Sequence, residues 1–135
     1  MILKTYSRLF SSDCDATLAL LERLHGRKAH LRFRFGEWDL AGVGDMFVVA
    51  GTEASLAPIR DSHGPVIVHD LNVVEAELLA SGATITQPMT DVPTGRMLYA
   101  RHADGLHIEY VEWTETLVEK FVRLPQREGR LSSEL

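Results

Sequence analysis

The sequence predicts an α+β fold in which one unit, a strand, a helix and three further strands, occurs twice. Strictly alternating apolar and polar residues in HLRFRF indicate a half-buried strand. Leucines at helical spacing in ATLALLERLHG indicate an amphipathic helix. The same order of patterns begins again near Ser62, and Asp13 and Asp70 stand at corresponding helix starts. We therefore expect two copies of the unit along the chain.

The composition is that of a globular domain with one hydrophobic core. The chain has 135 residues, of which 45% are hydrophobic and 24% are charged. No apolar run reaches the roughly 18 residues of a membrane span, and MILKTYSRLF does not resemble a secretory signal, so the expected compartment is the cytoplasm. A net charge of −5 argues against a nucleic-acid partner. The single cysteine, Cys14, excludes an internal disulfide and a zinc site of several thiolates.

The first unit is expected within about residues 1–56. It begins with a strand at Leu3–Phe10, and Ser12 or Asp13 then caps a helix that closes on Gly26. Glycine turns separate the strands that follow. These strands are expected at residues 30–35, Trp38–Val43 and Met46–Ala50.

The second unit is expected within about residues 63–113, after a connection at Gly51–Ser62. A helix capped by Asp70 closes on Gly82, and Ala103-Asp104-Gly105 turns the last two strands. Its strands are expected at His63–Val68, residues 83–88, Met97–His102 and Leu106–Trp113. Residues 1–113 then form one domain, and residues 114–135 form a terminal helix up to Pro125 and a polar tail.

Three stretches of the sequence form a recognisable pattern: SSDCDATLALLERLHG, HGPVIVHDLNVVEAELLASGA and TGRMLYARHADGLHIEYVEW. They resemble the vicinal oxygen chelate superfamily of glyoxalases, bleomycin-resistance proteins, fosfomycin-resistance enzymes and extradiol dioxygenases. The resemblance covers Leu3 to Trp113, and its most specific part is the GR, aromatic, DG and IE pattern of the last stretch. It implies two βαβββ modules whose sheets curl into a cup, a divalent metal at the floor, a small molecule that chelates the metal, and a homodimer.

The resemblance also implies metal ligands at particular positions. His63 lies seven residues before the helix cap Asp70, where the superfamily commonly has a histidine, and Glu109 is the glutamate of the IE pair. The matching positions in the first module hold Tyr6 and Val49, so only part of the metal site is retained. The expected metal is Zn²⁺, Mn²⁺, Ni²⁺ or Fe²⁺, all of which accept imidazole and carboxylate ligands.

His107 is the candidate for a third ligand. The period of two along a strand places His107 and Glu109 on one face, which is the inner face if Glu109 points into the cup. A hydrogen-bonded or ionic pair at a strand surface explains the same two residues equally well. Expected substrate contacts are apolar or stacking at Tyr6, Phe35, Trp38 and Met97, with Arg8 or Arg96 as partners for an anionic group.

Three hypotheses of function follow, and they leave open whether the chain is an enzyme. The first is a small-molecule binding protein of the bleomycin-resistance type with an incomplete or altered metal site. The second is a metal-dependent lyase, isomerase or dioxygenase in which His63 and Glu109 hold the ion and Glu109 or His107 moves a proton. The third is an interaction module whose cup is filled by its own side chains.

Overall fold

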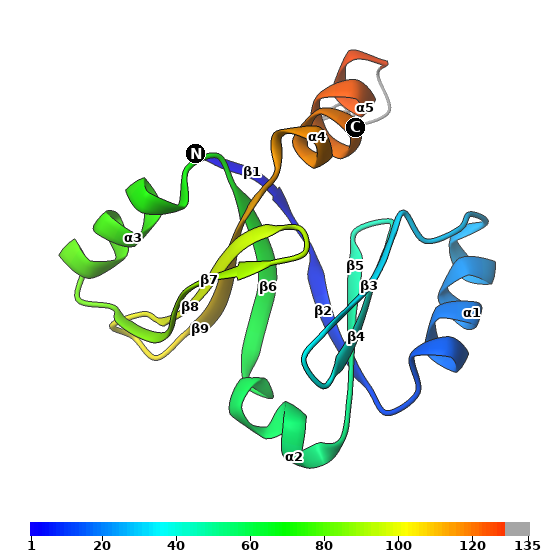
Figure 1. Cartoon of the computed structure of the whole chain (residues 1–135), viewed down its shortest axis with the longest axis horizontal. Helices are drawn as coiled ribbons and strands as arrows, with labels where there is room; N and C mark the ends of the chain where they lie inside the picture. The colour runs from blue at the N-terminus through cyan, green and yellow to red at the C-terminus, as the bar shows by residue number, and fades with distance from the viewer. Residues whose placement is uncertain (129–135) are drawn as a thin grey trace.

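The computed structural model describes residues 1–128 as two β-sheets that face each other, with one helix against the outer side of each sheet (Figure 1). In order across the five-stranded sheet lie β1 (Ile2–Thr5), β6 (Ser62–Val68), β9 (His107–Trp113), β8 (Gly95–Arg101) and β7 (Thr84–Val92). The four-stranded sheet has the order β2 (Ser7–Ser11), β5 (Met46–Ala50), β4 (Trp38–Val43) and β3 (Leu31–Phe35). Helix α1 (Cys14–His25) packs on β4 and β5, and α3 (Leu71–Ala80) packs on β7, β8 and β9.

The predicted α+β class and its repeated unit are confirmed. Within each unit the first strand runs parallel to the last one, as β2 does to β5 and β6 does to β9, while the remaining pairs are antiparallel. The predicted helix starts are also correct. Asp13 accepts a hydrogen bond from the Ala16 amide, and Asp70 accepts hydrogen bonds from the Asn72 and Val73 amides.

The predicted opening strand, Leu3–Phe10, is wrong as one element. The chain leaves one sheet after β1, which pairs with β6, and enters the other at β2, which pairs with β5. Tyr6 lies at this crossing and is 2% exposed. Because both halves have strand-like sequences, the residue pattern alone does not locate the change of sheet. The crossing places β2, and with it Arg8, opposite the five-stranded sheet.

Two segments, the linker between the units and the C-terminal segment, contain more helix than the sequence indicates. Helix α2 (Glu53–Leu56), capped by Thr52, and the 3₁₀ turn η1 (Ala57–Ile59) lie within the predicted linker, and both are too short to show a period. The predicted terminal helix does not stop at Pro125, because α4 (Glu115–Val118) continues through a π-helical turn, η2 (Glu119–Arg123), into α5 (Leu124–Arg127). Pro125 directly follows the π-helical turn, in which the Leu124 amide donates to the Glu119 carbonyl. Most of the predicted polar tail, residues 129–135, lies outside the described residues.

Apolar side chains form three layers, which show the face each strand residue occupies. On β8 and β9, Met97 and Val111 belong to the layer between the two sheets, whereas Leu98 and Tyr110 belong to the layer under α3. Val118 and Val122 of the C-terminal helices close one end of the layer between the sheets. No helix in residues 1–128 has the length and apolar character needed to cross a membrane.

Candidate functional site

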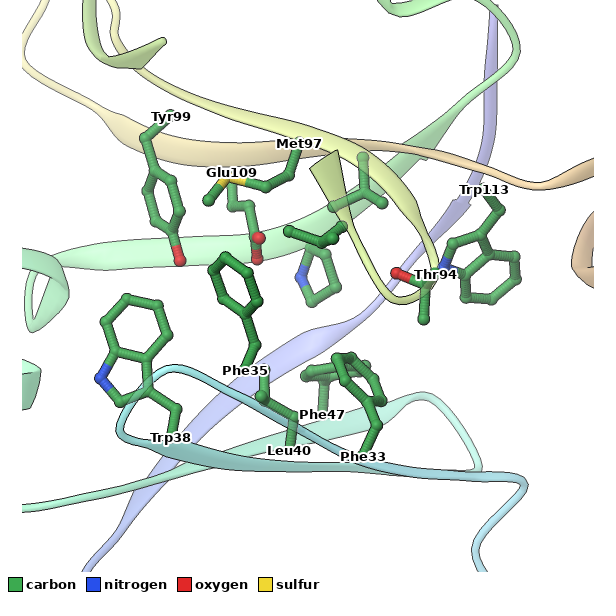
Figure 2. A pocket seen from close by; sticks show the side chains of 13 residues that line it. Phe33, Phe35, Trp38, Leu40, Phe47, Thr94, Met97, Tyr99, Glu109 and Trp113 are labelled. Carbon is green, nitrogen blue, oxygen red and sulfur yellow. The ribbon is translucent and has the colours of Figure 1, made fainter. Parts of the chain in front are cut away.

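A cavity lies between the two sheets of the single chain, and six of the thirteen residues that line it are aromatic (Figure 2). Including its open mouth it measures about 450 Å³, but only a small part of this volume has room for a water molecule. The cavity is therefore narrow as well as apolar. The four-stranded sheet contributes Phe33, Phe35, Trp38, Leu40 and Phe47 to the wall. The five-stranded sheet contributes Pro65, Val92, Met97, Tyr99, Glu109, Val111 and Trp113, and Thr94 comes from the turn between β7 and β8.

One end of the cavity is polar because an ion pair joins the two sheets there. Nη2 of Arg8, on β2, donates to Oε1 of Glu109, on β9. Nη1 of Arg8 also donates to Ser62 Oγ at 2.9 Å and to the Tyr99 hydroxyl at 3.1 Å. The Arg8 side chain is 1% exposed and the Glu109 side chain 12% exposed. A guanidinium cation therefore occupies the position beside the Glu109 carboxylate.

The protonation of this group follows from its surroundings. Burial lowers the pKa of Arg8, but the charge of Glu109, together with hydrogen bonds to Glu109 and Tyr99, raises it by more, so the net direction is upward from the ordinary value. Burial, and then the charge of Glu109, raises the pKa of Tyr99 as well. Arg8 is thus a permanent cation and Tyr99 a neutral hydroxyl. The Nε of Arg8 is buried and has no hydrogen-bond partner among the described residues.

Two polar atoms of this group remain available to the cavity. Oε2 of Glu109 accepts no hydrogen bond from residues 1–128, and the Tyr99 hydroxyl, which accepts from Arg8, still has its own hydrogen to donate. Tyr99 and Glu109 are directly opposite each other on β8 and β9. Figure 2 shows both side chains pointing from their strands toward Phe35 and Trp38. An acceptor and a donor therefore lie side by side at the polar end.

His107 is on the same inner face but does not line the cavity. It is 3% exposed, and its ring centroid lies 5.6 Å from that of Tyr99. Nδ1 lies 2.8 Å from Asp61 Oδ1, and Nε2 lies 2.7 Å from Thr86 Oγ1. Because a carboxylate only accepts, Nδ1 carries a hydrogen. The hydrogen bond from His107, and then one from Arg101, lowers the pKa of Asp61. Both ring nitrogens of His107 are therefore engaged.

His63 is not brought to Glu109. It is exposed and in register with Ile108, which packs in the layer under α3. Its neighbour Ser62 is in register with His107 and reaches Arg8. The register of β6 against β9 shifts between His63 and Val66, and a shift of one residue exchanges the faces of a strand. Ser62 therefore has the inner position that the sequence pattern assigns to His63.

The divalent metal that the resemblance implies does not fit these side chains. The Glu109 carboxylate is paired with Arg8, both His107 nitrogens have partners, and His63 is on the other face. No group of three histidine, cysteine, aspartate or glutamate side chains in residues 1–128 is placed to hold an ion. The guanidinium would also repel a divalent cation at Glu109.

The other predicted contact residues are divided between the cavity and elsewhere. Phe35, Trp38 and Met97 line the cavity. Arg96 lies on the opposite face of β8, where it pairs with Glu112 at 3.1 Å. Tyr6 is in the core next to the cavity, and its hydroxyl lies 2.6 Å from Nε2 of His30.

Sequence reasoning missed two members of the polar group, Tyr99 and Ser62. A signal for Tyr99 was present, because strand parity places it on the same face as Met97 and the hairpin register places it opposite Glu109. No comparable signal was present for Ser62, since the register shift in β6 reverses its expected face.

Comparisons with known proteins agree with the fold. No family model matches the sequence, and no curated protein matches it. Among solved structures, an uncharacterized protein from Methanosarcina mazei is 33% identical, with a TM-score of 0.79 over 85% of this chain and 95% of that one. The chain belongs to the same family as this protein.

Two more distant structures show how widely the fold is shared. The methylmalonyl-CoA epimerase from Mycobacterium tuberculosis is 14% identical, with a TM-score of 0.70 over 87% of this chain and 93% of its own. A variant of the Streptomyces coelicolor epimerase in complex with 2-nitronate-propionyl-CoA is 14% identical, with a TM-score of 0.67 over 85% and 97%. At this identity the likeness concerns the fold alone. The predicted vicinal-oxygen-chelate fold of two βαβββ modules is confirmed.

Proposed function

We propose that this family member binds a small, planar and largely apolar molecule in the cavity between its sheets, without a metal ion. The observation that carries the proposal is the cavity itself, which combines aromatic side chains from both sheets with a polar end at Glu109 and Tyr99. Ligand sites in proteins are typically apolar concavities with a few placed polar groups. Flat aromatic walls favour planar ligands, which stack on them.

We expect the walls to move apart on binding, because the cavity is narrow. The tip of the β3–β4 hairpin is the segment best placed to move. It holds the half-buried Phe35 and Trp38, and the Trp38 indole donates to the Ser55 carbonyl at 3.1 Å. Apart from Thr94, in the turn between β7 and β8, the rest of the cavity wall lies on strands within the two sheets. We expect the hairpin tip to shift when a ligand enters.

A metal-dependent lyase, isomerase or dioxygenase is the alternative implied by the resemblance. It would need Glu109 to exchange Arg8 for an ion and His63 to change face. We therefore favour metal-free binding. A homodimer is proposed on the resemblance alone, and light scattering coupled to size-exclusion chromatography would test it.

The two tryptophans of the chain provide a direct test, because both Trp38 and Trp113 line the cavity. We would follow their indole N–H signals by NMR during titration with 2-naphthol and with its saturated, non-planar analogue decahydro-2-naphthol. The proposal expects saturable shifts of both signals, with tighter binding of 2-naphthol. No response to either compound would contradict it and favour a cup filled by its own side chains.

A matched pair of variants localises the binding. Val111→Phe fills the cavity and is expected to abolish the shifts, whereas Val73→Phe, at a position on α3 that is 45% exposed, is expected to leave them unchanged. Circular dichroism would verify that both variants are folded. Equal binding by the two variants would place the ligand outside the cavity.

A further inference from the structure

The charges at the polar end of the cavity cancel. Among the described residues that line the cavity, Glu109 alone carries a charge, and Arg8 lies against it from the neighbouring sheet. Arg8 is held in place by Ser62 and Tyr99 as well as by Glu109. The cation is therefore a fixed part of the protein, and the cavity wall presents a neutral pair instead of a free charge.

We infer that this polar end selects an uncharged head group carrying a donor and an acceptor side by side, such as a primary carboxamide, and discriminates against carboxylates and amidinium cations. The inference rests on the proposed binding function and gives it a ligand class. It replaces the expectation that Arg8 recognises an anion. The Arg8 charge is already matched by Glu109, so it does not offset the charge of a ligand.

The hydrogen-bonding positions match a carboxamide. An amide N–H can donate to Oε2 of Glu109, and the amide oxygen can accept from the Tyr99 hydroxyl, which is opposite Glu109 on the adjacent strand. Tyr99 acts as a donor over the whole neutral range, because its pKa lies above the ordinary value of a tyrosine. The Glu109 and Tyr99 side chains both point toward Phe35 and Trp38 (Figure 2). The apolar part of the ligand would lie between these two aromatic side chains and the five-stranded sheet.

A charged head group of the same shape is disfavoured for a different reason in each case. A carboxylate would face the Glu109 carboxylate, and an amidinium would bring a second cation toward Arg8. Either ion would also lose its hydration in a largely apolar cavity without gaining an uncompensated opposite charge. A neutral amide avoids both costs.

Benzamide, benzamidine and benzoate test the inference, because they share one ring and nearly one shape but carry charges of zero, plus one and minus one. Dissociation constants would be measured from the indole N–H shifts of Trp38 and Trp113. For the wild type we expect benzamide to bind at least about tenfold more tightly than either ion. Equal or tighter binding of benzoate or benzamidine would overturn the inference.

Two variants change the charge of the site in opposite directions. Arg8→Met leaves Glu109 as a single negative charge, so benzamidine is expected to become the tightest ligand. Glu109→Gln leaves Arg8 as a single positive charge, so benzoate is expected to become the tightest. The double variant is neutral again and should return to a preference for benzamide. An unchanged order of affinities in the charge variants would overturn the inference.

Controls separate the possible failures. Arg32→Met removes an arginine that pairs with Asp15 on the surface at 3.0 Å, and it should keep the order of the wild type. If Arg8→Met does not fold, Glu109→Gln and the double variant still decide the question, by a preference for benzoate and for benzamide respectively. Binding of 2-naphthol without a charge order among the three compounds would overturn the inference alone. No binding of 2-naphthol or of the three compounds would remove the proposed function and the inference together.

Discussion

The first strands of the two modules differ at the position where the superfamily resemblance expects a metal-binding histidine. Tyr6 and His63 both lie seven residues before a helix cap, yet Tyr6 is 2% exposed at the crossing between sheets, and His63 is exposed on the outer face of β6. The same distance from a cap therefore gives different environments, because β6 contains a register shift and the first strand changes sheet. Neither module supplies the histidine, and Arg8 of the first module pairs with Glu109 of the second.

The largest expected effect comes from breaking the pair between the modules. Arg8→Ala leaves the Glu109 carboxylate without its cation, and we expect a loss of about 3–5 kcal/mol in the free energy of unfolding. His63→Ala, an exposed substitution, should change it by less than about 0.5 kcal/mol. Urea unfolding at neutral pH measures both. The Arg8→Met, Glu109→Gln double variant should recover much of the loss, and a failure to recover would show that the cost comes from packing.

The next largest expected effect is a dependence of stability on pH that comes from His30 in the first module. The Tyr6 hydroxyl lies within hydrogen-bond distance of Nε2 of His30, and burial, followed by the charges of Lys4 and Arg27, lowers the pKa of His30 to about 4. The unfolded chain, with an ordinary histidine, binds more protons between about pH 6.5 and pH 4, so stability falls as the pH falls through this window. We expect a loss of about 1–2 kcal/mol, allowing for solvent screening of the half-buried ring.

Thermal unfolding between pH 7.5 and pH 4 measures this loss of stability. The His30→Phe variant should lose the part of the pH dependence that belongs to the window, whereas His63→Gln, in the second module, should retain it. Identical pH profiles for the wild type and His30→Phe would contradict the assignment. Both residues are histidines, but His30 is half-buried beside the core residue Tyr6, whereas His63 is exposed.

Local sequence patterns predicted the parts of the fold that local forces determine. The caps at Asp13 and Asp70 and the β8–β9 hairpin follow from near neighbours along the chain. The contact between Arg8 and Glu109 joins residues 101 positions apart, and it depends on the change of sheet at Tyr6. Residue periodicity carries no information on such a pairing. For this reason the cavity residues Phe35, Trp38 and Met97 were found, but the partner of Glu109 was not.

A smaller effect separates two adjacent residues in β6. Ser62 Oγ accepts a hydrogen bond from Arg8 and donates to the Ile59 carbonyl, so Ser62→Ala should cost about 1 kcal/mol. His63→Ala, one position further, should cost less than about half of that. Chemical denaturation of both variants measures the difference. Equal costs would argue against the register shift that gives the two side chains opposite faces.

The smallest expected effect is that of added metal, for which we predict none at Glu109. Arg8 already neutralises this carboxylate, so a divalent ion would have to displace a cation that Ser62 and Tyr99 also hold. Zn²⁺, Mn²⁺, Ni²⁺ or Fe²⁺ should therefore leave the unfolding midpoint of the wild type unchanged, because an ion stabilises the folded state only if it binds it. Elemental mass spectrometry of wild type and Glu109→Ala, purified without chelator, is the complementary measurement. About one metal per chain in the wild type and none in the variant would show that the pair opens in solution, and would return the metal-dependent hypothesis to first place.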